Sequence, residues 1–128
     1  MDRRTLISGL ALAPVAVAAP AVAQTMLCAP VDTIDAAIAE YQRQRAIDDA
    51  HPFGTTRMDD PRYEELSADC SRQIAITMAA FEKVIDTPSR NAGDIGRKLE
   101  IVLREYGDCE FPDDVIERIA ADAKRLAA

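Results

Sequence analysis

The segment PRYEELSADCSRQIAITMAAFEKVID, residues 61–86, decides the fold because it predicts one long amphipathic helix. Its apolar residues recur every three or four positions, which places them on one face of a helix. That stripe consists of Tyr63, Leu66, Cys70, Ile74, Thr77, Met78, Phe81, Val84 and Ile85. Asp60 is a suitable N-cap, and Pro61 suits the first helical position. Other helices must cover this long apolar face.

Three further segments show helical spacing, at residues 32–49, 91–106 and 112–126. In the first segment the expected inward residues are Ile34, Ala37, Ile38, Tyr41 and Arg45. In the second they are Ile95, Leu99, Val102, Leu103 and Tyr106. In the third they are Val115, Ile116, Ile119, Ala123 and Leu126. The longest loop spans 50–60, and no stretch alternates for long enough to predict a strand. Short connections favour antiparallel neighbours. The sequence therefore predicts an all-α antiparallel bundle of three to four helices.

The first residues, MDRRTLISGLALAPVAVAAPAVAQ, have the three parts of an export signal. Arg3 and Arg4 supply a positive start, residues 6–23 carry no charge, and Ala21 and Ala23 form an A-x-A cleavage site. We therefore expect a leader over 1–23 and a single helical domain over 24–128. The arginine pair favours the twin-arginine route, with general secretion as the alternative.

Two prolines in the leader argue against a membrane anchor. Pro14 and Pro20 interrupt the apolar stretch, and a proline inside a helix removes a hydrogen bond and clashes with the preceding turn. We expect a periplasmic or secreted protein without stable membrane anchoring once the leader is cleaved.

The charge balance excludes one class of partner. The chain has 15 basic and 22 acidic residues and a net charge of −7. Removal of the leader takes away two arginines and one aspartate, which makes the balance one unit more negative. Such a chain repels nucleic acid, and with no Trp it has no ready stacking platform for bases. We expect no nucleic-acid partner.

Three cysteines follow the leader, and export would place them where disulfides form. If the second and third predicted helices fold back about residue 88, position 106 lies beside about position 70. Cys109 then lies near Cys70, whereas Cys28 is about 20 Å from Cys70 at 1.5 Å per residue. We predict a Cys70–Cys109 disulfide, with Cys28 unpaired or joining two chains. The alternative is that Cys70 is a core residue and Cys109 a loop thiol.

Few residues offer catalytic or metal-binding chemistry. His51, the only histidine, lies between two pairs of aspartates, which permits a metal site; a charge at a helix C-terminus is the simpler interpretation. Asp59 and Asp60 followed by Glu64 and Glu65 lack the alternation and glycine of a calcium loop. No nucleophile, phosphate-binding or haem-attachment motif is present in the sequence. We expect no cofactor; an enzymatic activity is not indicated but is left open.

The order of segments resembles a loose group of short bacterial helical proteins with a twin-arginine-type leader. The matching stretches are DRRTLISGLALAP, PVDTIDAAIAEYQRQ, TPSRNAGDIGRKLEIVLRE and IERIAADAKRLAA, at residues 2–14, 30–44, 87–105 and 116–128. The resemblance implies a helical fold after a leader and carries no assigned activity.

The sequence as a whole favours an exported, non-enzymatic interaction protein that binds another protein through an exposed helical face. The alternative is a periplasmic carrier that holds a small ligand or a metal in the bundle core. The sequence specifies neither the partner nor the oligomeric state.

Overall fold

The computed structural model describes residues 33–107 and 109–128, and these residues form four α-helices and one short 3-10 helix. The helices are α1 (Ile34–Asp49), η2 (Pro52–Thr55), α2 (Tyr63–Asp86), α3 (Ala92–Tyr106) and α4 (Asp113–Ala127). No strand occurs in the described ranges. The all-α prediction is confirmed, with each helix within two residues of its predicted bounds. The export signal and Cys28 lie outside the described residues.

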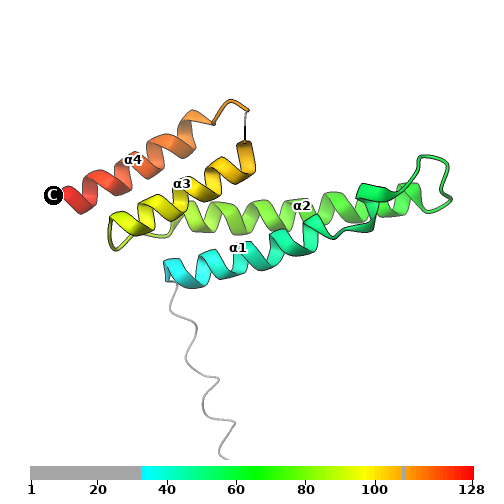
Figure 1. Ribbon diagram of the computed structural model, residues 1–128, viewed down its shortest axis with the longest axis horizontal. Helices are drawn as coiled ribbons and strands as arrows, with labels where there is room; N and C mark the ends of the chain where they lie inside the picture. Colours follow the sequence, from blue (N-terminus) through cyan, green and yellow to red (C-terminus); the bar gives the residue numbers. More distant parts are fainter. Residues whose placement is uncertain (1–32, 108) are drawn as a thin grey trace, which may run out of the picture.

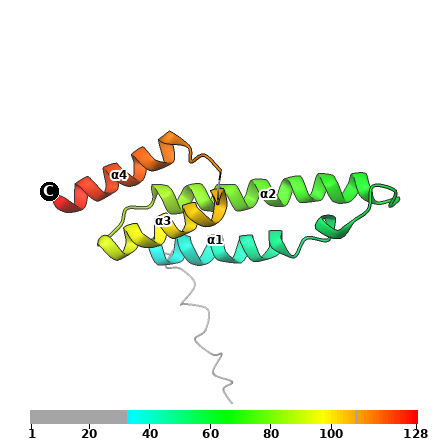
Figure 2. The same ribbon diagram turned by 45° about the horizontal axis from the view of Figure 1, so that its top comes forward.

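The helices form two antiparallel pairs of unequal length, shown in Figures 1 and 2. The pair α1–α2 is a long hairpin, and α3 and α4 pack against only one end of it. We call this part the four-helix end; it comprises residues 33–41, 77–107 and 109–128. The rest of the hairpin, residues 42–76, projects from this end, and we call it the projecting hairpin; its first residues still reach α3 through the ion pairs of Arg45 with Glu105 and of Asp49 with Arg104. No described helix is long and apolar enough to cross a membrane.

The hydrophobic core lies entirely in the four-helix end. Its buried members are Ile34, Ala37, Ile38, Tyr41, Ala80, Phe81, Val84, Ile85, Ile101, Val102, Val115 and Ile119. The Phe81 ring lies at its centre, edge-on to the rings of Tyr41 at 6.3 Å and Tyr106 at 6.0 Å between centroids. None of these residues belongs to the projecting hairpin. The apolar stripe of α2 is therefore covered only along its C-terminal half.

Local capping explains where the helices begin. The Thr33 hydroxyl accepts a hydrogen bond from the Ala36 N–H, and the Asn91 side chain accepts one from the Asp94 N–H. Asp60 accepts from the Arg62 N–H in the turn before α2, but the N-cap of α2 is Arg62, so the prediction of Asp60 as the N-cap is wrong by two residues. Such shifts of one or two residues are usual at helix ends.

The predicted inward face of α3 is partly wrong. Leu99 and Leu103 were expected in the core, but their side chains are 40% and 57% exposed. Asp94 and Lys98 are buried instead, at 2% and 0% exposure. On α4, Ile116 was also expected inside and is 40% exposed. Helix α3 is therefore rotated so that a carboxylate and an ammonium face inward, and two leucines face solvent.

The predicted disulfide between Cys70 and Cys109 is not formed, since both cysteines are free. The predicted register was wrong: the Tyr106 ring contacts Phe81, which is 11 residues along α2 from Cys70. At 1.5 Å per residue this separation is about 16 Å, against a limit of about 7 Å between the Cα atoms of a disulfide. The Cys109 N–H donates to the Tyr106 carbonyl, which keeps Cys109 at this distant position.

Candidate functional site

A buried lysine fixes the orientation of α3. The Lys98 ammonium donates hydrogen bonds to the carbonyl oxygens of Ile85 and Thr87, at 3.0 and 2.6 Å. These carbonyls end α2, where the last turn of a helix lacks partners of its own. The same ammonium contacts the Asp122 carboxylate of α4 at 2.8 Å. Lys98 thus joins three helices at one buried point.

Asp122 completes this buried cluster. Its carboxylate accepts hydrogen bonds from the Ser89 N–H at 2.9 Å and from the Arg125 guanidinium at 2.8 Å. Burial acts to raise the pKa of Asp122, but the hydrogen bonds from Lys98, Ser89 and Arg125 outweigh burial and hold the pKa well below its usual range. Asp122 is therefore an anion at neutral pH, and it neutralises the buried ammonium.

A second ionic cluster attaches α3 to α1. Asp94 is buried and accepts from the side chain and the backbone N–H of Arg90 and from the side chain of Arg97. The hydrogen bonds from Arg90, and then from Arg97, hold the pKa of Asp94 well below its usual range. Both arginines also contact Asp35 of α1, each at 2.9 Å. Further along α3, the Tyr41 hydroxyl donates to Glu105.

The inward positions of Asp94 and Lys98 leave an apolar strip on the side of α3 that faces α4. Together with the matching side of α4 it forms what we call the α3–α4 seam. Its residues are Ala92, Ile95, Leu99 and Leu103 on α3 and Ile116, Ala120, Ala123 and Ala127 on α4. At one end the seam opens into a hollow of about 420 Å³, which is lined by Arg90, Asn91, Ala92, Ile95, Ala123, Leu126 and Ala127.

The antiparallel register places the large seam residues opposite each other. Ile95 shares the hollow with Ala123, and at the other end the rings of Tyr106 and Phe111 are 6.2 Å apart. Each residue advances a helix by the same length, so equal numbers of residues from these two contacts reach the same level in both helices. By this count Leu103 of α3 lies close to the level of Ile116 of α4. The seam thus runs along two neighbouring helices, and its large side chains Leu99, Leu103 and Ile116 are exposed.

The charged residues that border the seam differ between its two ends. Asp113 and Glu117 lie at the end where α4 begins, and Lys124 lies near the end where it finishes. All three are exposed, and none has an ionic or hydrogen-bonded partner among the described residues. The seam therefore has an acidic end and a basic end, and the charged side chains named at both ends are unpaired.

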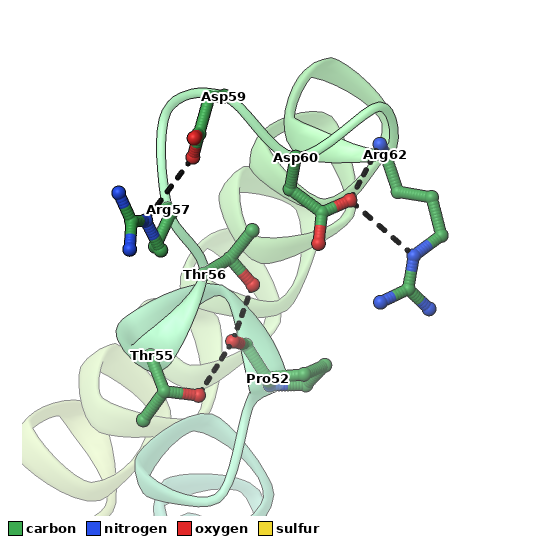
Figure 3. Close-up of a pocket in the computed structure, with 7 residues that line it drawn as sticks. All are labelled: Pro52, Thr55, Thr56, Arg57, Asp59, Asp60 and Arg62. Atoms are coloured by element: carbon green, nitrogen blue, oxygen red, sulfur yellow. Dashed lines mark hydrogen bonds and ion pairs between the residues drawn. The ribbon is translucent and has the colours of Figure 1, made fainter.

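The larger hollow of the molecule, about 550 Å³, lies in the loop before α2 (Figure 3). Its charged side chains are paired within the loop: Arg57 with Asp59 at 3.2 Å, and Arg62 with Asp60 at 3.5 Å. Hydrogen bonds to Arg62, the backbone bond first, lower the pKa of Asp60. The two threonine hydroxyls there both donate to the Pro52 carbonyl. Each charged side chain of this hollow has an ion-pair partner within the loop, so the hollow offers no unpaired charge to a ligand.

His51 contacts a carboxylate other than the aspartates that flank it in the sequence. Its Nε2 is 3.0 Å from the Asp69 carboxylate of α2, and its Nδ1 accepts a hydrogen bond from the Phe53 N–H. Within the described residues no group of three histidine, cysteine, aspartate or glutamate side chains can hold a metal ion. His51 instead connects the loop to α2. A ligand or metal carrier remains a prediction that no contact in the structure favours.

Comparison with protein families, with curated proteins and with solved structures found no match to this chain. The resemblance to short bacterial proteins with a twin-arginine-type leader therefore stays a prediction. The function must be argued from the geometry of the seam.

Apolar spacing did not predict the buried lysine. One signal for it was present: Asp122 follows Ile119 by three residues and so lies on the inward face of its helix. A carboxylate at such a position requires a buried cation or several N–H donors. The sequence does not show that Lys98 is that cation, because Arg90, Arg97 and Arg125 are also candidates.

Proposed function

We propose that the protein is an exported, non-enzymatic interaction protein whose α3–α4 seam binds an apolar helical surface of another protein chain. The observation that carries the proposal is the exposure of Leu99, Leu103 and Ile116, at 40%, 57% and 40%, along one strip. Single exposed apolar residues are ordinary, but a continuous strip bordered by charges is typical of an interaction surface.

The shape of the seam favours a helix as the bound element. A third helix can lie along the groove between two antiparallel helices and present residues at spacings of three and four. Ala120, Ala123 and Ala127 on α4 are small, so a bound helix can approach closely. Leu103 and Ile116 supply the large apolar side chains that such a helix would cover.

A photo-crosslinking residue placed in the seam tests the proposal in cells that express the whole chain. We expect Leu103→benzoylphenylalanine to give discrete crosslinked protein products. The matched control is the same replacement at Ile76, an isoleucine of α2 that is 49% exposed and lies outside the seam. No product at Leu103, or the same products at both positions, would overturn the proposal. Mass spectrometry of the product identifies the bound chain.

The export part of the proposal is tested separately, by the N-terminal sequence of the protein from its native host. We expect the protein to begin at Gln24 and to be recovered from the periplasm or the medium. Soluble cytosolic protein with Met1 intact would contradict export. Lysines in place of Arg3 and Arg4 distinguish the two routes, because only the twin-arginine route depends on the arginine pair.

A further inference from the structure

We infer that the partner chain that fits the seam is a second copy of this protein, docked antiparallel to the first about a twofold axis. The inference rests on the proposed function of the seam and names its occupant. Three features support it: the distribution of charge along α4, the small residues at the middle of the seam, and the lack of partners for Asp113, Glu117 and Lys124 among the described residues.

The seams of two copies have complementary charges only when the copies dock antiparallel. Asp113 and Glu117 lie at one end and Lys124 at the other. Parallel docking of two copies would place the acidic ends together and the basic ends together. Antiparallel docking places the acidic end of each copy over the basic end of the other, and a twofold axis forms both contacts at once.

The position of the axis follows from this pairing. When Glu117 of one copy faces Lys124 of the second copy, the twofold axis crosses α4 midway between positions 117 and 124. This point lies between Ala120 and Ala121. Both residues are alanines and both are exposed. Small side chains at a helix crossing allow the two backbones to approach closely. The residues at the axis and the charges therefore favour the same antiparallel dimer.

The lysine that borders the seam is exceptional among the basic side chains. Within residues 33–107 and 109–128, Lys124 is the only basic side chain without an ionic or hydrogen-bonded partner. On the opposite side of α4, Arg118 contacts Glu82 and Asp86 of α2. The basic side chains are therefore paired within one chain except at the seam, where Lys124, and with it Glu117, remains available to a second copy.

The size of the seam sets the expected strength of the dimer. Residues 92–103 of α3 span about 17 Å at 1.5 Å per residue. A contact of this length buries less surface area than the interfaces of permanent dimers. Association should therefore be weak and depend on protein concentration. We expect the monomer at low concentration and the dimer at high concentration, with dissociation promoted by salt because the pairs are exposed.

Charge reversal tests the antiparallel pairing by sedimentation equilibrium of the whole purified protein. We expect Glu117→Lys alone and Lys124→Glu alone each to raise the dimer Kd about tenfold, because each creates two repulsive contacts across the axis. The double variant E117K/K124E should restore the Kd of the unaltered protein. Unchanged dimerisation in both single variants, or no recovery in the double variant, would overturn the inference.

Disulfide trapping tests the position of the axis. In the antiparallel dimer the two copies of residue 120 are adjacent, so we expect Ala120→Cys to give a covalent dimer linked through that position. The native Cys109 is an internal control, because it lies at one end of the seam and its two copies are far apart in this arrangement. Covalent dimers linked through Cys109 instead, as peptide mapping would show, would establish the parallel arrangement and reject the inference.

The outcomes separate this inference from the function on which it rests. A protein that is monomeric at all concentrations but crosslinks a different protein through Leu103 would overturn the dimer and leave the interaction function standing. A monomer without any crosslinked product at Leu103 would overturn both. Leu103→Asp should abolish the dimer while Ile76→Asp leaves it intact, and equal helicity in both variants confirms that folding is preserved.

Discussion

The four-helix end and the projecting hairpin share α1 and α2, yet different interactions hold them together. In the four-helix end the two helices are covered by α3 and α4, and every buried apolar residue lies there. In the projecting hairpin the same helices face water on most sides. The difference shows that a long amphipathic helix acquires its stability from the elements that cover it rather than from its own apolar stripe.

Polar contacts replace apolar packing in the projecting hairpin. The Gln73 amide donates to the Gln44 side chain at 3.0 Å, and His51 contacts Asp69. The rings of Phe53 and Tyr63 are 5.3 Å apart and form the aromatic contact of the tip. These interactions are exposed or half-buried, so each contributes less than a buried apolar residue of the core.

The largest expected effect is that of Phe81→Ala, which removes the ring at the centre of the core. We expect a loss of about 4 kcal/mol in the free energy of unfolding, because the site cannot collapse around the missing ring. The matched change Phe53→Ala, in the half-buried pair of the tip, should cost about 1 kcal/mol. Urea denaturation measures both. Equal losses would contradict the division of the molecule into two regions.

Lys98→Met should cost about 3 kcal/mol, because it leaves Asp122 without its buried cation and leaves two carbonyls at the end of α2 without donors. Lys124→Met is the control, with an expected change below about 0.5 kcal/mol since that lysine is exposed and unpaired. Thermal unfolding followed by circular dichroism compares the two variants. A small effect at Lys98 would show that the cluster is dispensable.

Acid should weaken the four-helix end more than the tip. The folded pKa values of Asp94 and Asp122 lie below the ordinary value of 3.8, so their stabilising effect is complete above that value and declines as pH falls below it. Urea midpoints at pH 7, 5 and 3 should fall mainly between pH 5 and 3. Asp122→Asn should lower stability at pH 7 and reduce this fall. Rising stability toward pH 3 would contradict the assignment.

The smallest expected effect is that of Asp60→Ala, at about 0.5–1 kcal/mol. It removes the acceptor of the Arg62 N–H just before α2. We expect faster hydrogen exchange of amides in the first turns of α2 and unchanged exchange in its last turns. Asp59→Ala is the control, because Asp59 makes only an exposed contact to Arg57. Uniformly faster exchange along all of α2 would show that the tip does not open on its own.

The sequence predicts the helices well and the site only in part. Apolar spacing, together with Asp60 and Pro61 at the start of the longest helix, places all four helices within two residues, because these signals act locally. The inward face of α3 was predicted wrongly, because spacing assigns every large apolar residue to the core. The residues of α3 that face inward are determined by the contacts of Lys98 with Asp122 and with the carbonyls at the end of α2.

The disulfide prediction failed for a related reason. It assumed that α2 and α3 run side by side from their shared turn, so that distances along one helix map directly onto the other. The Tyr106–Phe81 contact shows that the end of α3 meets α2 well short of Cys70. Such a register is set by how side chains pack between helices, which residue spacing does not reveal.

The three contacts of Lys98 also determine how the molecule can come apart. They involve the last turn of α2, the segment that follows it, and α4. If α4 detached alone, an ammonium would remain in an apolar interior without its counter-ion, so partial opening there is more costly than losing α3 and α4 together. We therefore expect these two helices to unfold as one cooperative unit, while the projecting hairpin opens locally.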